Sequence, residues 1–297
     1  MTEPSGDWAQ TIVHLLAIAD RLEGHGQLNN AKLARAAADA LTRRAAYSLN
    51  LPHDPDDNVS DLNHLLVALP GLGLSEALAS AIGRGAAAMA AGRLPLHDEI
   101  PHPYVCRTCG ELTLTTPVAP CATCGAWPTT FQQFQPVYWL DDLHPREALT
   151  QLEAAPEIVS SILEGLDEEQ LSRTPAEEGW AMRQIVAHIR DAEGVLHSRL
   201  GLMTGQENPV LESLAVFAWA TSEENRPPTT AEIFQTYRES RRETVAILKG
   251  LAAWAWWRTG RHKEFGEVTI LQQASYFSAH EQTHFAGLTA LRNAATS

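Results

Sequence analysis

The chain contains four cysteines, and all four lie in one short segment, YVCRTCGELTLTTPVAPCATCGAWPTTF. Cys106 and Cys109 form one C-x-x-C pair, Cys121 and Cys124 form a second, and eleven residues separate the two pairs. Two such pairs on a short β-hairpin allow four thiolates to converge tetrahedrally on one metal ion. The pattern therefore predicts a tetracysteine metal site carried by a small β ribbon.

A glycine follows each C-x-x-C pair, at Gly110 and Gly125, where the backbone must turn under the metal with a positive φ angle. The alternatives are two disulfides or four unrelated thiols. The N-terminal sequence MTEPSGDWAQTIVHLL has no basic region before an apolar core, so it does not resemble a secretory signal. Without export, disulfides would have to persist in a reducing compartment, and we therefore favour the metal site.

The composition indicates a soluble globular protein that binds neither nucleic acid nor membranes. The 297 residues are enough for two domains, 44% are hydrophobic, and the formal net charge is −14. Nucleic acids are bound largely through Lys and Arg contacts to phosphate, so this acidity argues against them and against an anionic membrane surface. No run of about 18 apolar residues is present, so we expect no membrane span and a cytoplasmic location.

The cysteine segment resembles the rubredoxin-like domain found at one end of rubrerythrins. The resemblance rests on Tyr104 before the first pair, on the sequences CRTCG and CATCGA, and on Phe131 after the second pair. Ala122 departs from it, because such knuckles usually carry proline at this position. In that family the metal is iron, which passes electrons to a di-iron site in an adjoining helical bundle. The resemblance therefore implies iron and a redox role for the ribbon.

Residues 1–100 are predicted to form a helical bundle that lacks the ligands of a di-iron site. Apolar residues recur at helical spacing in two segments, at Ile12, Leu15, Leu16, Ala19 and Leu22, and at Leu33, Ala36, Ala37 and Leu41. A rubrerythrin bundle would need Glu-x-x-His pairs and further inward glutamates, and this region has none. Without that redox partner, zinc is the preferred metal for the four cysteines, and iron is the alternative.

The remainder of the chain is predicted to be helical, which makes the fold mainly α. We expect an N-terminal helical domain at 1–100, a rubredoxin-like metal ribbon at 101–140 and a four-helix bundle at 141–297, joined through the proline-flanked linker PVYWLDDLHP. Four long helices are expected, over about 145–165 with a kink at Pro156, over about 180–202, after Thr229 with its partner Glu232, and from Thr269 with its partner Gln272.

Histidines fall on the inner faces of two of these helices. The buried stripe of the second helix is expected to comprise Met182, Ile185, Ile189, Ala192, Leu196 and Leu200. His188 lies beside this stripe and faces the bundle interior or its edge. On the last helix, His280 and His284 are four residues apart and stack one turn above the other, so their imidazoles can chelate a single cation.

The sequence from His280 to His284 also matches H-E-x-x-H, the helix signature of zinc proteases. The extended protease motif needs a third histidine at the position of Ala290, and the thirteen residues after His284 include no Asp, Glu or His. An all-helical chain also lacks the edge strand with which such proteases grip a peptide. We therefore reject a protease, and the third ligand must come from upstream, where His188 is the natural candidate.

The segments EEGWAMRQIVAHIRDAEGVLHSRL and WWRTGRHKEFGEVTILQQASYFSAHEQTHFAGLTALR resemble the DinB superfamily, in its YfiT-like branch. The matching motifs are Trp180 before the second helix, the turn from Phe265 to Thr269, and three histidines. The resemblance implies a four-helix bundle with one metal ion held by three histidines, here His188, His280 and His284. Characterised members activate low-molecular-weight thiols as S-transferases or isomerases, and others are metal-dependent hydrolases.

The resemblance implies a metal-dependent enzyme of hydrolase or thiol S-transferase type that acts on a small molecule, with a low-molecular-weight thiol as one candidate. We expect zinc, nickel, manganese or iron at the three-histidine site and zinc or iron at the tetracysteine site. Glu281 is the candidate catalytic residue, either as general base or as a group that orients the ligands, unless it is simply solvated. The alternative function is metal binding or sensing without turnover, or a rubrerythrin-like redox role. Apolar bundle faces favour a homodimer.

Other polar residues near these motifs admit two interpretations. Asp191 could orient the histidine of the second helix through its second ring nitrogen, or could form an exposed ion pair with Arg190 or Arg199. His197 is turned to the opposite helix face and is expected to be solvated. His262, in the connection RTGRHKEFGE, is expected to be an exposed loop residue or to lie at the mouth of the site.

Overall fold

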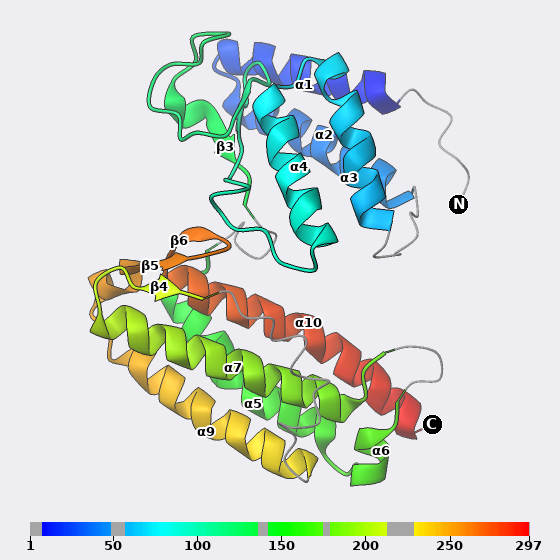
Figure 1. Cartoon of the computed structure of the whole chain (residues 1–297), viewed down its shortest axis with the longest axis vertical. Helices are drawn as coiled ribbons and strands as arrows, with labels where there is room; N and C mark the ends of the chain where they lie inside the picture. The colour runs from blue at the N-terminus through cyan, green and yellow to red at the C-terminus, as the bar shows by residue number, and fades with distance from the viewer. Residues whose placement is uncertain (1–7, 49–56, 136–141, 175–178, 213–228, 297) are drawn as a thin grey trace. The chain divides into compact units, whose positions relative to one another are not determined.

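Figure 1 shows the computed structural model of the chain, which describes residues 8–48, 57–135, 142–174, 179–212 and 229–296. The predicted mainly α fold is confirmed within these residues. The chain separates into two compact units, Met1–Ala79 with Val105–Gln132, and Ser80–Tyr104 with Gln133–Ser297. The three-domain division stays a prediction, and most of the predicted linker PVYWLDDLHP lies outside the described residues.

The first unit begins with a helical hairpin. Its helices are α1 (Trp8–Gly24), α2 (Leu28–Ser48) and α3 (Asp57–Ala68), followed by the 3-10 turn η1 (Pro70–Leu72) and by α4 (Glu76–Ala90), which continues into the second unit. The α1 and α2 helices pack together, and Arg35 on α2 donates two hydrogen bonds to Glu23 on α1, at 2.7 and 2.8 Å. The predicted apolar stripes are only partly covered, because Leu16 and Leu33 are exposed by 42% and 64%.

The cysteine segment folds as the predicted small β ribbon. Its strands are β1 (Tyr104–Cys106), β2 (Leu112–Thr113) and β3 (Phe131–Gln133), in the order β2-β1-β3, with the 3-10 turn η2 (Pro128–Thr130) before β3. Gly110 and Gly125 have φ angles of 83° and 74°, the positive values predicted for the turns that follow each cysteine pair.

A four-helix bundle forms most of the second unit (Figure 1). Its helices are α5 (Pro145–Leu163), α7 (Met182–Gly205), α9 (Thr230–Lys249) and α10 (Ile270–Thr296), and the short helix α6 (Glu168–Ser172), which we did not predict, packs against α7. Both α5 and α7 pack against α9 and against α10. The α9 and α10 helices are therefore diagonal partners across the bundle core. Among the described residues, no helix combines the length and the apolarity needed to cross a bilayer.

The core of the bundle follows the predicted periodicity. All six residues of the predicted α7 stripe are buried, at Met182, Ile185, Ile189, Ala192, Leu196 and Leu200. Each fully buried large apolar side chain contributes roughly 1.5–3 kcal/mol. Two helix starts also follow the predicted capping chemistry, since the Thr229 hydroxyl accepts from the Glu232 N–H, and Thr269 and Gln272 exchange reciprocal hydrogen bonds at 2.9 and 3.1 Å.

A second small sheet, absent from our sequence-based expectation, precedes α10. Its strands are β4 (Val210–Leu211), β5 (Thr259–His262) and β6 (Gly266–Thr269), in the order β4-β5-β6. The β4 strand follows α7, whereas β5 and β6 follow the 3-10 helix η5 (Ala253–Trp257). The β4 and β5 strands are parallel, and β5 and β6 form an antiparallel hairpin. Its second strand begins at Gly266, whose φ angle is 75°. Because β6 ends at Thr269, where α10 is capped, this hairpin determines where the histidine-bearing helix begins.

Candidate metal centres

The three predicted histidines meet between α7 and α10. The Nε2 atom of His280 lies 3.1 Å from Nε2 of His188 and 3.2 Å from Nε2 of His284. The ring centroids of the three imidazoles are 4.7–5.0 Å apart, and their planes are steeply inclined to one another. Two helices that are distant in sequence thus bring three nitrogen donors to one point.

The spacing of these nitrogens fits ligands of one metal ion. Nitrogens that each lie ~2.0–2.1 Å from a zinc ion, at a mutual angle of ~100°, are ~3.1–3.2 Å apart. The His188 side chain is buried, whereas His280 and His284 are partly buried. No fourth His, Cys, Asp or Glu ligand belongs to the group in the part of the chain that the structure describes. Three protein ligands leave a coordination position for water or substrate, the arrangement of catalytic zinc sites.

The surroundings of the two α10 imidazoles favour the neutral form that binds metals. Burial, together with the neighbouring His284 and His188, lowers the pKa of His280 to about 3. Burial also lowers the pKa of His284, against the opposing effect of Glu281. Because metal ligation requires an unprotonated ring nitrogen, these shifts favour metal over proton at neutral pH.

Two aromatic side chains border the three imidazoles. Trp180 meets His188 edge to face, with ring centroids 5.0 Å apart, and Tyr276 lies parallel to the His280 ring at 6.2 Å. The Tyr276 ring also contacts Phe277 of the core at 5.2 Å. These ring contacts help to hold the orientations of His188 and His280.

Glu281 lies beside the ligands but faces away from them. The side chain is 2% exposed, so the solvated alternative is wrong. Oε1 accepts hydrogen bonds from the Tyr237 hydroxyl at 3.1 Å and from Arg241 Nη2 at 2.6 Å, while Oε2 accepts from Arg241 Nη1 at 2.9 Å. Both carboxylate oxygens are therefore engaged, which fits a group that orients the ligands better than a general base.

For Asp191 and His197 the structure distinguishes between a role at the site and a role outside it. Asp191 accepts from Arg190 at 2.6 and 2.9 Å and does not orient a histidine, and this pair is largely buried instead of exposed. His197 is turned away from the other histidines, as predicted, with its Nδ1 3.2 Å from the Thr244 hydroxyl and its side chain 35% exposed. Neither residue joins the candidate site.

The expectation for His262 was wrong, because this residue is buried on β5. Arg199 Nη2 lies 2.8 Å from its Nε2, and the backbone N–H groups of Glu264 and Phe265 lie 3.1 and 3.2 Å from its Nδ1. Donors thus approach both ring nitrogens, which leaves little room for an imidazolium. Burial, followed by the charge of Arg199, lowers the pKa of His262 to about 3.

This burial predicts an acid-dependent loss of stability. An unfolded histidine has a pKa of about 6.5, so below that pH the unfolded chain binds a proton that folded His262 does not. Stability is unaffected above about pH 6.5 and falls, by at most ~1.4 kcal/mol per pH unit, until the folded pKa is reached. In His262→Gln, urea unfolding midpoints measured at pH 7.5 and 5.0 are expected to differ less than in the wild type. An undiminished difference would contradict this role.

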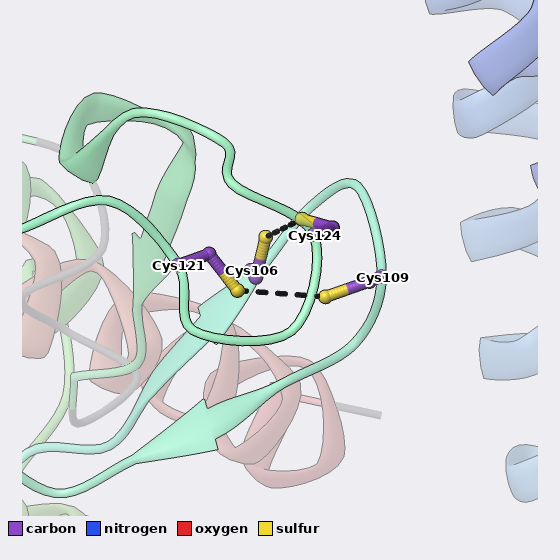
Figure 2. A group of neighbouring side chains, drawn as sticks. All are labelled: Cys106, Cys109, Cys121 and Cys124. Carbon is purple, nitrogen blue, oxygen red and sulfur yellow. Dashed lines mark hydrogen bonds between the residues drawn. The ribbon is translucent and has the colours of Figure 1, made fainter.

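The four cysteines also converge, as Figure 2 shows. Sγ of Cys106 lies 3.8 Å from Sγ of Cys124, and Sγ of Cys109 lies 3.6 Å from Sγ of Cys121. All four are free cysteines, since a disulfide would bring two sulfurs to about 2.05 Å. Sulfurs bound tetrahedrally to zinc at ~2.3 Å are ~3.8 Å apart, so the spacing fits one such ion.

The two cysteine loops share one backbone pattern. In the first, the Gly110 N–H donates to the Cys106 carbonyl at 2.9 Å, and in the second, the Gly125 N–H donates to the Cys121 carbonyl at 2.8 Å. Although burial raises it, backbone N–H groups of Cys109 and Thr108 bring the pKa of the Cys106 thiol down to about 6. The thiolate that a metal ion needs is therefore favoured at Cys106.

One residue next to the site, Arg241, was not predicted from the sequence. Arg241 is 2% exposed and donates to the carboxylate of Glu281, the neighbour of a predicted ligand. The available signal was its position on the inner face of α9, where it follows Ile233 and Tyr237 at intervals of four. A charged residue at such a position requires a buried partner.

Comparisons with known proteins concern the C-terminal half. Residues 151–287 match the family model of the DinB superfamily. A protein of Oceanobacillus iheyensis, named as a candidate metal-dependent hydrolase, is 27% identical over 146 residues, which cover 49% of this chain and 84% of the relative. A similarly named protein of Bacillus cereus is 24% identical over 144 residues, covering 48% of this chain and 83% of the relative.

Two solved structures show likeness to the same half. YfiT from Bacillus subtilis, a four-helix bundle of unusual topology, aligns with a TM-score of 0.46 and 21% identity, over 53% of this chain and 91% of that chain. A mycothiol-dependent maleylpyruvate isomerase aligns with a TM-score of 0.40 and 17% identity, over 50% of this chain and 61% of that chain.

Proposed function

Since the C-terminal bundle is a domain of the DinB superfamily, we propose that this protein is a metal-dependent hydrolase of a small molecule. His188, His280 and His284 would hold one divalent transition-metal ion. The observation that carries the proposal is the convergence of three Nε2 atoms at 3.1 and 3.2 Å within the matched segment. The names of the relatives, which refer to metal-dependent hydrolysis, support it.

The chain's own residues supply binding and orientation. A divalent ion in such a site supplies Lewis acidity, which favours ionisation of water or of a thiol and polarises a carbonyl. The three imidazoles offer nitrogen donors, while Trp180 and Tyr276 contact the rings of His188 and His280. We assign no proton transfer to Glu281, whose oxygens are held by Arg241 and Tyr237; its predicted catalytic role stays a prediction.

The remaining parts of the proposal concern the ribbon and the assembly. We assign zinc to the tetracysteine site, where it would hold the two loops together, with iron as the alternative. A cytoplasmic location and a homodimer complete the proposal. Trp254 and Trp257 on η5, exposed by 69% and 58%, support a subunit contact.

An activity screen separates this function from its alternatives. Full-length protein loaded with Zn²⁺, Ni²⁺ or Mn²⁺ is assayed against chromogenic carboxylic and phosphoric esters, and against electrophiles with and without low-molecular-weight thiols. We expect metal-dependent ester hydrolysis, and we expect its rate to fall at least ~100-fold in His280→Ala, because a site with only two of its three ligands binds the metal ion much more weakly. The control His197→Ala removes a histidine outside the site and should keep full activity.

Two other outcomes of the screen would change the assignment. Turnover that requires an added thiol would identify a thiol S-transferase. Inactivity of every metal-loaded form would contradict an enzyme and favour metal binding or sensing. A red colour of protein purified from its own host would indicate ferric iron at the tetracysteine site and a redox role instead.

A further inference from the structure

A group of buried polar side chains lies at the centre of the bundle, next to the three histidines. Its members come from three helices and are each exposed by 2% or less: Glu193 on α7, Tyr237, Arg241 and Thr244 on α9, and Glu281 on α10. Burying a charge is costly unless the charge is paired and hydrogen-bonded. A buried ionic group of this kind can specify one relative orientation of the helices more strictly than apolar side chains would.

Arg241 is the hub of the group. Its Nε donates to Oε2 of Glu193 at 2.7 Å, and its Nη1 and Nη2 donate to the two oxygens of Glu281 at 2.9 and 2.6 Å. The pair with Glu281 is thus bidentate, with two parallel N–H···O bonds between planar groups. Such a pair is strong in one relative orientation only, and this directionality distinguishes it from an apolar contact.

The same guanidinium also reaches α5. Proline has no N–H, so Pro156 leaves the carbonyl of Leu152, four residues earlier, without its helical donor. Arg241 Nη1 donates to this carbonyl at 3.1 Å. Arg241, which itself lies on α9, therefore joins α5, α7 and α10 through hydrogen bonds and reaches its diagonal partner α10 across the core.

Glu281 connects this hub to the metal ligands. It directly follows His280 and precedes His284 by three residues, so on a helix with about 100° per residue it lies some 60–100° around the axis from both. The histidines of α10 face His188 on α7, and Glu281 faces Tyr237 and Arg241 on α9. Rotation of α10 would therefore break the bidentate pair and move both imidazoles together.

We propose that Arg241 is a positioning residue of the metal centre, which fixes the rotation of α10 through Glu281 and so holds His280 and His284 opposite His188. The inference rests on the proposed function only in that the three histidines bind a metal ion. In this arrangement Glu281 links Arg241 to the helix that carries His280 and His284. Metal affinity should therefore depend on the Arg241–Glu281 pair more than on the Arg241–Glu193 pair.

A matched pair of substitutions tests the inference. Glu281→Gln and Glu193→Gln each remove one carboxylate from Arg241 at equally buried positions, but only residue 281 adjoins the ligands. The full chain is treated with a chelator until about one zinc per chain remains in the tetracysteine site, and Ni²⁺ is then titrated by calorimetry. Thermal midpoints of the same samples report the purely structural cost of each change.

The expected result is a split between affinity and stability. Both substitutions lower the thermal midpoint, but Glu281→Gln weakens Ni²⁺ binding by ~10–100-fold and Glu193→Gln by less than ~3-fold. Equal losses of affinity, or unchanged affinity in Glu281→Gln, would overturn the inference while leaving the proposed function intact. If the wild type bound no Ni²⁺ in this titration, the proposed function would fall, and the inference with it.

A second matched pair of substitutions retains every charge, and it tests the role of Arg241 if Glu281→Gln does not fold. Tyr237→Phe removes the hydroxyl that donates to Glu281 at 3.1 Å, and Thr244→Val removes the hydroxyl that donates to Glu193. Weaker Ni²⁺ binding in Tyr237→Phe alone would support the inference. The same affinity in both variants would overturn it.

Discussion

Replacing Arg241 by methionine is expected to lower the free energy of unfolding of the bundle by about 3–5 kcal/mol. The change removes a guanidinium that is 2% exposed and leaves Glu193 and Glu281 buried without their cation. It also leaves the Leu152 carbonyl without a donor, because Pro156 cannot supply one. Urea unfolding followed by circular dichroism at neutral pH measures the loss.

Two further variants show whether the loss comes from unpaired burial. Arg238→Met, on the same helix, removes a guanidinium whose side chain is 48% exposed and 3.8 Å from Glu157, and should cost at most ~1 kcal/mol. A triple variant, Arg241→Met with Glu193→Leu and Glu281→Leu, should recover much of the stability, because apolar replacements of a whole buried ionic group are often tolerated. A small loss in Arg241→Met, similar to that of Arg238→Met, would show that the buried guanidinium does not stabilise the bundle through its two carboxylates.

Local patterns were sufficient to predict the framework of the site. The periodicity of apolar residues predicted the buried stripe of α7, and the capping pair Thr269 and Gln272 predicted the start of α10. Both features depend on residues within one or two helical turns. The positions of His188, His280 and His284 followed from the same periodicity. The spacing of the cysteines likewise predicted a convergent group, which the sulfur separations confirm as geometry.

The missed features depend on contacts between residues distant in sequence. The partners of Arg241 lie 48 and 40 residues away, at Glu193 and Glu281, and no local pattern links them. His262, in the connection RTGRHKEFGE, was expected to be an exposed loop residue or to lie at the mouth of the site, yet it pairs in a hairpin and contacts Arg199 of α7. Strands of four residues with charged side chains give too weak an alternation to be recognised.

The second large effect is expected from His188→Ala. This substitution removes the only ligand that α7 contributes, and the two remaining imidazoles, four residues apart on one helix, bind a transition metal far more weakly than three. We expect the variant to lose the metal ion of the bundle and the hydrolytic activity while the tetracysteine ion stays bound. The fold should persist, because alanine is a strong helix former.

Native mass spectrometry of the zinc-loaded full chain tests whether imidazoles from α7 and α10 share one metal ion. We expect about two zinc ions per chain in the wild type and in His197→Ala, one for each candidate group, and about one in His188→Ala. Two ions in His188→Ala, or only one in the wild type, would contradict the claim that imidazoles from α7 and α10 share a metal ion.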